Sequence, residues 1–315
     1  MSFSFITKIF IFFILTQYSL YSYTSIKYER TNKVAFDYSY SNASSLFLRS
    51  GELAIDNIQR LTAGSSAEGD FTSSYNFNSR IMTFSLEGTY LLTDKLNLNS
   101  RITFQNRFLD QTQTIRYVRY EFGNPQIIGK NDLPLDDENE NIFSDFQIGA
   151  SYFAFSEKVY LIFDSQLFIP FGFDDGQFGD ITNEYLGDGA LKWINGFRLG
   201  NMFDNSFAYL QSSYIYRDED FRDQVLIAAG LEHYKIEDVI VFGKLEYLYT
   251  INGFIDGYDV RPHLNNIQED YLQVLMGIQM NFDNLNFNIA YNLKPIGRNT
   301  LNNSVIHFRA SYLFK

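Results

Sequence analysis

The sequence predicts an all-β chain that forms one transmembrane antiparallel β-barrel of about 12 strands in an up-and-down meander. Apolar and polar residues alternate over segments of about ten residues, the length that a tilted strand needs to cross the hydrocarbon layer. Short and long connections between these segments follow each other in turn. Beyond the N-terminal region no window offers the roughly twenty apolar residues of a transmembrane helix, so membrane insertion would use strands.

Composition excludes several classes of protein. Cysteine is absent, so neither disulfides nor thiolate metal sites can hold the fold together. The formal net charge of −12 argues against nucleic acid as a partner, because phosphate binding needs clustered Lys and Arg. Aromatic residues make up 18% of the chain, which is high for a soluble protein.

The N-terminus has the pattern of a secretory signal peptide. Lys8 precedes the apolar run 9–15, and small polar residues follow within cleavage distance. Cleavage after Ser22 or after Thr24 fits this pattern, and the exact bond stays open. We therefore expect residues 1–24 to be removed and residues 25–315 to form a single barrel domain.

The first hairpin shows the alternation clearly. After an early strand at residues 34–41 and a long first loop through Phe77, the apolar residues Met82, Phe84, Leu86 and Tyr90 alternate with polar ones. A tight turn follows at residues 93–94, and residues 95–108 again present one apolar and one hydrated face.

Later segments repeat this pattern. Alternating strands are expected at residues 239–249, 285–292 and 306–314. Tight turns are expected at residues 156–157, 204–205, 237–238 and 283–284. Longer connections are expected at residues 110–141, 172–188, 217–223, 251–270 and 295–303.

This alternation of short and long connections is typical of a bacterial barrel, with short turns in the periplasm and longer loops outside. A soluble sandwich has no reason to keep it. The count of about twelve strands places both termini in the periplasm. The series Ile306, Phe308, Ala310, Tyr312 and Phe314 resembles the C-terminal signal read by the barrel-assembly machinery, although Lys315 follows the last Phe.

The polar face of each strand predicts a hydrated lumen. About twelve strands enclose more space than eight, whose interior side chains just fill. Opposite charges could equally pair across a filled interior, and the residues alone leave both outcomes open. The candidate lumen-lining residues are Glu87, Arg101, Arg107, Asp164, Gln166, Lys192, Arg198, Lys244, Glu246 and Arg309.

Two other functions stay open. The long connections are acidic, as at residues 132–140, so a non-conducting surface barrel could bind a partner through them. No segment has EF-hand spacing, and we predict no metal site. A lipid-modifying enzyme would need a membrane-facing Ser and His pair, for which His233 is the one suggestive position. No G-x-S-x-G element is present, and we predict no catalytic residues.

One region resembles a known family. The segments DFQIGASYFAF (145–155), LFIPFG (167–172) and LGDGALKWINGFRLG (186–200) resemble the outer-membrane channel family associated with meta-pathway phenol degradation, itself similar to fatty-acid and aromatic-hydrocarbon channels. The early hairpin YLLTDKLNLNSRITF (90–104) is also similar. In that family a strand ends in Pro-x-Gly and the next begins with Gly-x-Gly. The matching structural turn residues are Pro170, Gly172, Gly187 and Gly189.

The resemblance implies passage of small molecules, hydrophobic or aromatic ones among them. Together these observations predict an outer-membrane channel without cofactor or covalent chemistry. Its expected partners are outer-membrane lipid, a small-molecule substrate and the assembly machinery.

Overall fold

The computed structural model describes residues 31–47, 53–55, 58–60, 70–121, 124–134, 138–155, 159–170, 191–217, 223–236, 238–251, 270–298 and 300–314. Within these ranges every regular element is a β-strand. None of the described residues belongs to a helix long and apolar enough to cross a membrane. The predicted signal peptide, residues 1–24, lies outside the described residues.

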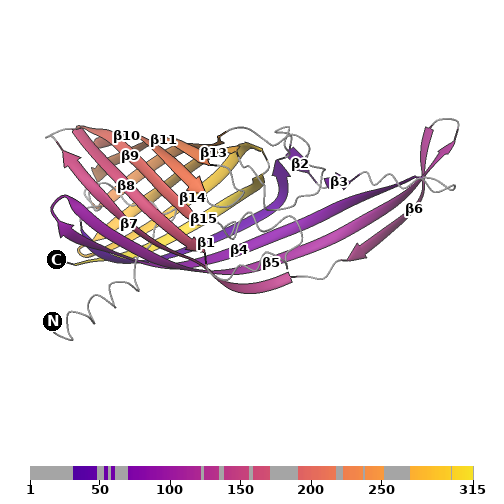
Figure 1. Ribbon diagram of the computed structural model, residues 1–315, viewed down its shortest axis with the longest axis horizontal. Coiled ribbons are helices and arrows are strands. Elements are labelled where there is room, and N and C mark those ends of the chain that lie inside the picture. The colour runs from indigo at the N-terminus through magenta and orange to yellow at the C-terminus, as the bar shows by residue number, and fades with distance from the viewer. Residues whose placement is uncertain are drawn as a thin grey trace.

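Twelve strands form one closed antiparallel barrel, which confirms the predicted fold class (Figure 1). Each strand pairs with the next barrel strand along the chain, and β1 closes the ring by pairing with both β15 and β4. The barrel strands are β1 (Asn32–Phe47), β4 (Asp70–Thr93), β5 (Leu96–Glu121), β7 (Glu138–Phe155), β8 (Val159–Pro170), β9 (Lys192–Phe203), β10 (Ser206–Arg217), β11 (Gln224–Ile236), β12 (Val239–Thr250), β13 (Asp270–Phe282), β14 (Leu285–Arg298) and β15 (Thr300–Phe314).

Three shorter strands lie outside the ring. β2 (Leu53–Ile55) pairs with the end of β1, β3 (Ile58–Arg60) pairs with β4, and β6 (Asn124–Pro134) pairs with β5. Figure 1 shows β4 and β5 reaching well past the end of the barrel, with β6 beside the far part of β5.

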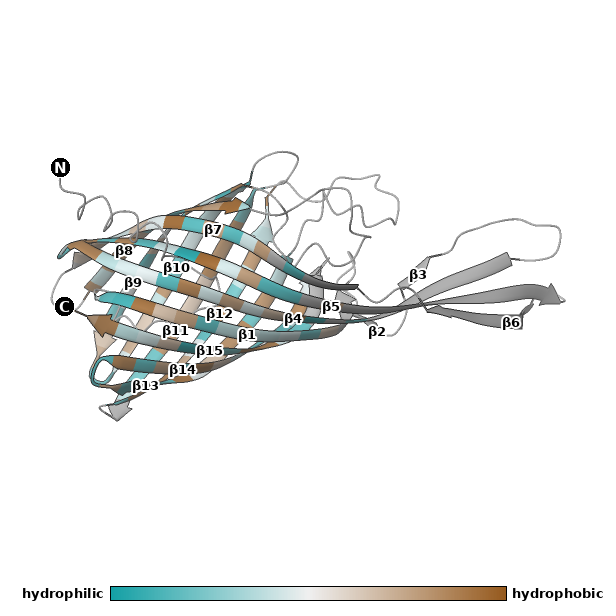
Figure 2. Cartoon of the chain, turned by 90° about the horizontal axis from the view of Figure 1, so that it is seen from below, coloured by the Kyte–Doolittle hydropathy of each residue, from teal (hydrophilic) through white to brown (hydrophobic). Residues whose placement is uncertain are grey.

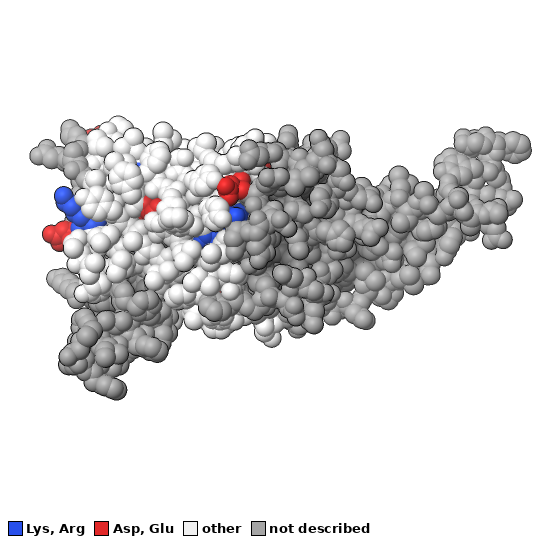
Figure 3. Space-filling view, in the orientation of Figure 1, with Lys and Arg blue, Asp and Glu red and all other residues white. Residues whose placement is uncertain are grey.

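The outer wall is apolar because the alternation places large hydrophobic residues on it. Leu210 keeps 62% and Phe203 keeps 56% of its surface exposed. Brown and teal residues alternate along the strands in Figure 2. In Figure 3 the charged atoms of the described wall gather mostly toward its two ends, as expected for a surface in contact with hydrocarbon.

Tight turns connect neighbouring strands at one end of the barrel. Asp204 and Asp283 adopt left-handed backbone conformations, with φ of 47° and 49°. Both begin two-residue Asp-Asn turns, which tolerate this conformation and match the twist of a hairpin. The first turn occupies residues 94–95, one residue later than expected, because Thr93 still pairs with Leu96.

Two expected connections are largely strand, so the sequence interpretation of them was wrong. Residues 110–121 continue β5, which pairs with β4 as far as Val118 and with β6 from Thr112 onward. β7 already begins at Glu138. Residues 295–298 extend β14, and β15 begins at Thr300. The long first loop likewise ends at Asp70, where β4 begins. Ladder hydrogen bonds need no apolar face, so these polar segments stay paired without the alternation that marks a membrane strand.

Inward-facing glycines accept aromatic rings from neighbouring strands. A Cβ at Gly230 would overlap the Tyr209 ring, and one at Gly200 would overlap the Phe207 ring. Gly230 lies directly across the ladder from Tyr209, whereas Gly200 lies diagonally across from Phe207, whose direct partner is Met202. Each ring therefore lies along the barrel wall instead of projecting across the interior.

This packing predicts that Gly230→Val destabilises the barrel by about 1–3 kcal/mol, since the added methyl groups would displace the Tyr209 ring. Gly243→Val is the matched control, because the nearest atom to an added Cβ there is the Leu275 carbonyl oxygen at 3.9 Å. Denaturant midpoints followed by heat-modifiable gel migration measure both variants. Equal midpoints for the two variants would contradict the packing role of Gly230.

Candidate channel lumen

The ladder register defines one inner face around the whole ring. Glu87 lies opposite Arg101, Arg101 lies opposite Gln147, and Asp37 lies opposite Arg309. Following these pairs through the twelve strands assigns each residue to the inner or the outer face, since side chains alternate along a strand.

Nine of the ten candidate lumen residues have described side chains, and all nine lie on the inner face by register. The Arg107 side chain is outside the described residues. Pro170 ends β8, where no further ladder donor is needed. Gly172, Gly187 and Gly189 lie outside the described residues, so their role in turns stays a prediction.

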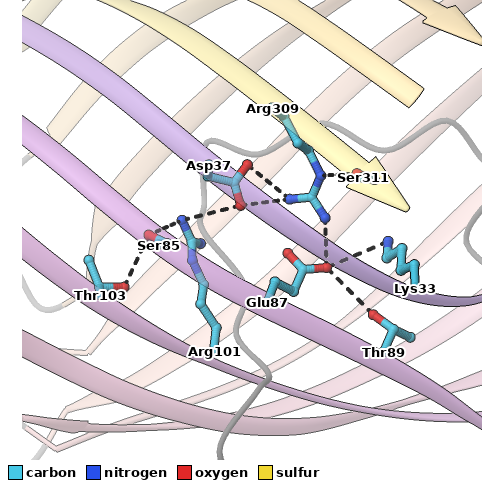
Figure 4. A network of polar contacts seen from close by, with 9 residues as sticks. All are labelled: Lys33, Asp37, Ser85, Glu87, Thr89, Arg101, Thr103, Arg309 and Ser311. Atoms are coloured by element: carbon cyan, nitrogen blue, oxygen red, sulfur yellow. Dashed lines mark hydrogen bonds and ion pairs between the residues drawn. The ribbon is translucent and has the colours of Figure 1, made fainter. Parts of the chain in front are cut away.

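A network of buried charges spans the strands on both sides of the β1–β15 closure (Figure 4). Arg309 of β15 contacts Asp37 of β1, with Nη1 at 2.9 Å from Oδ2, and Glu87 of β4, with Nη2 at 2.7 Å from Oε1. Lys33 Nζ lies 3.5 Å from the same Glu87 oxygen. Arg101 of β5 lies 4.0 Å from Asp37 Oδ2.

Hydroxyl groups complete the network. Arg101 Nη2 donates to Ser85 Oγ at 2.9 Å, and Ser85 lies 3.3 Å from the Thr103 hydroxyl. Arg309 Nε donates to Ser311 Oγ at 3.3 Å. Each of the five charged side chains is at most 12% exposed, so their attraction acts in a poorly screened environment.

The network joins β15, β1, β4 and β5 from the inside. It contains three cations and two carboxylates, and the nearby carboxylate of Asp145 also attracts Arg101 electrostatically. Removing a central member would leave buried charges uncompensated, which is more costly than losing a surface ion pair.

The inner wall across the ring from the network carries polar groups in the middle of its strands. Asp164 and Arg198 are half-buried, as is Gln211. Asp164 accepts a hydrogen bond from Ser151 Oγ at 2.6 Å, and Arg198 lies over the Tyr209 ring at 5.4 Å. Lys244 pairs with Glu246. These half-buried polar groups fit a hydrated space inside the barrel.

Two of the three inward apolar clusters among the described residues lie on the same side of the inner wall, one near each end. The cluster near the tight turns contains Phe153, Ile162, Phe207 and Tyr209. The cluster near the opposite end contains Ile194, Ile215, Leu226, Ala228, Leu248 and Tyr271. The sequence pattern predicted a polar inner face and did not reveal these two clusters, because inward apolar residues interrupt the alternation on which that prediction depends. The runs at residues 160–163 and 225–229, apolar on both faces, were the available signal.

Histidine positions bear on the lipid-modifying alternative. His233 is exposed on the outer face, and its Nδ1 lies 2.9 Å from Ser206 Oγ across the β10–β11 ladder. His307 faces inward, as expected, and His263 lies outside the described residues. No group of three or more potential metal ligands occurs among the residues that the structure describes.

Comparisons with known proteins support the fold. No family model and no curated protein matches the chain. An outer-membrane channel from Pseudomonas putida F1 superposes with a TM-score of 0.56 at 14% identity, over 95% of this chain and 100% of that one. This likeness shows a shared barrel fold.

Other similar structures are described as a porin and a transporter. A KdgM porin in complex with oligogalacturonate has a TM-score of 0.46 at 8% identity, covering 89% of this chain and 99% of that one. The P. putida toluene transporter TodX has a TM-score of 0.38 at 10% identity, covering 90% of each chain.

The network generates a prediction about stability. Arg309→Gln should destabilise the barrel by about 3–5 kcal/mol, because Glu87 and Asp37 lose their shared cation. The double variant Glu87→Gln with Arg309→Gln removes one charge of each sign, so the net charge of the network stays as in the native chain and part of this loss should be recovered. Denaturant unfolding in detergent micelles measures both variants. The control is Lys95→Gln, which removes a positive charge at an exposed turn. If Arg309→Gln were as stable as this control, the network would have no structural role.

Proposed function

We propose that this chain is an outer-membrane channel that passes small molecules through the barrel lumen. The observation that carries the proposal is the two-sided wall, apolar outside and charged inside, in a ring whose twelve described strands each pair with a neighbour on both sides. A membrane interior offers no water to unpaired backbone groups, so a closed ring suits it and a soluble domain has no need of the apolar exterior.

The inner wall supports passage of polar or amphipathic solutes. Twelve strands enclose more space than the eight that side chains just fill. Half-buried Asp164, Arg198 and Lys244 offer hydrogen bonds and charge to a hydrated solute. The apolar clusters beside them offer contact area to an apolar group. Lining of the lumen by the ten candidate residues is part of this proposal.

Location and export belong to the same proposal. The predicted signal peptide would direct the chain across the inner membrane, and the C-terminal strand would be read by the assembly machinery. The resemblance at residues 145–200 favours small hydrophobic or aromatic substrates. The shared fold with outer-membrane channels agrees with an outer-membrane location.

Planar-bilayer recording of the refolded chain tests the channel function. We expect discrete single-channel steps, because the half-buried polar groups of the inner wall would accompany a hydrated ion. The control is the same preparation boiled before addition, which unfolds the barrel. A folded barrel that shows neither conductance nor solute uptake into liposomes would refute the proposal.

Lipid modification is the second candidate, favoured by the hydrogen bond between Ser206 and His233 on the outer face. His233 Nδ1 would take the proton as Ser206 Oγ attacks a lipid ester carbon. The leaving alcohol would receive that proton, and water would then release the acyl group.

This candidate predicts fatty-acid release from phospholipid vesicles by the unaltered chain. Ser206→Ala and His233→Ala should each abolish the release without changing heat-modifiable migration. Intact lipids after prolonged incubation with the unaltered, folded chain would remove this candidate and leave the channel proposal untouched.

A further inference from the structure

The net charge of the described inner face is positive, whereas the net charge of the whole chain is negative. The chain has a net charge of −12. Among the described barrel strands, by contrast, inward-facing cations outnumber inward-facing anions by eight to six. The cations are Lys33, Arg101, Lys192, Arg198, Arg217, Lys244, Lys294 and Arg309, and the anions are Asp37, Glu87, Asp145, Asp164, Glu232 and Glu246.

This excess lies outside the buried network. Within the network Asp37 and Glu87 contact the cations, and Asp145 also attracts Arg101 electrostatically, so three cations face three anions. Elsewhere on the described inner face five cations face three anions, so a solute there would meet a net positive charge with little screening.

Cations lie beside the apolar cluster of Ile194, Ile215, Leu226, Ala228, Leu248 and Tyr271, which is the cluster at the end opposite the tight turns. Lys192 and Arg217 face each other across the β9–β10 ladder, one step beyond Ile194 and Ile215. At the other side of the cluster Lys294 Nζ lies 4.1 Å from the centre of the Tyr271 ring. An apolar surface bordered by cations complements a molecule with an apolar body and a negative group.

We propose that the lumen selects amphipathic organic anions, molecules that join a compact apolar or aromatic group to one carboxylate. This inference rests on the proposed channel function and narrows its substrate class. Neutral hydrocarbons would displace water from charged inner-wall groups without replacing its hydrogen bonds. Organic cations would meet the positive excess.

The first experiment measures ion selectivity from the reversal potential across a bilayer in a KCl gradient. We expect chloride to be preferred over potassium. Arg198→Gln should lower the permeability ratio by about threefold, because it removes a half-buried positive charge from the inner wall. Lys95→Gln, the same charge change at an exposed turn, should leave the ratio unchanged. Conductance with potassium preferred would overturn the inference and leave the channel function standing.

The second experiment compares uptake of benzoate, benzylammonium and benzyl alcohol into liposomes that contain the refolded chain. We expect benzoate to enter fastest and Arg198→Gln to reduce its advantage. Equal rates for the three solutes would overturn the inference.

Calorimetric titration of the detergent-solubilised chain with benzoate separates binding of an organic anion from channel function. Saturable binding that Arg198→Gln weakens would support the site even without conductance, whereas absent conductance would refute the channel itself.

Discussion

Closure of the ring is the constraint on which the rest of this structure depends. Every membrane-spanning strand must pair on both edges, because hydrocarbon cannot hydrogen-bond to a free N–H or C=O group. Eleven of the twelve junctions join barrel strands that are consecutive along the chain. The twelfth joins β1, the first barrel strand, to β15, the last one. The buried network of Lys33, Asp37, Glu87 and the two arginines crosses this junction and ties its strands together from inside.

The same constraint shapes the interior. An apolar exterior forces polar side chains inward, where they must find partners or water. On one side of the ring they pair into the network, and on the other they stay half-buried between two apolar clusters. The lumen thus has two unlike walls, which is the physical basis for expecting solutes with both an apolar and a charged part.

Alternation and turn chemistry made most of the fold predictable. Residues 82–90 and 285–292 present opposite faces so consistently that strand and orientation follow from period two, and the rhythm of short and long connections added the prediction of a membrane barrel. The Asp-Asn turns were equally clear. Residues 110–121 were missed as strand because their sequence lacks the sustained apolar alternation of the membrane strands, although the ladder continues.

The sequence by itself determined the side of the wall on which each described candidate residue lies, because a strand has only two faces. It could not determine that Arg309 would meet Asp37 and Glu87, which lie more than two hundred residues earlier, since that requires knowing how the ring closes. Nor could it place Ile194 and Leu248 in one apolar cluster. Only the stagger of neighbouring strands brings such residues to the same part of the lumen.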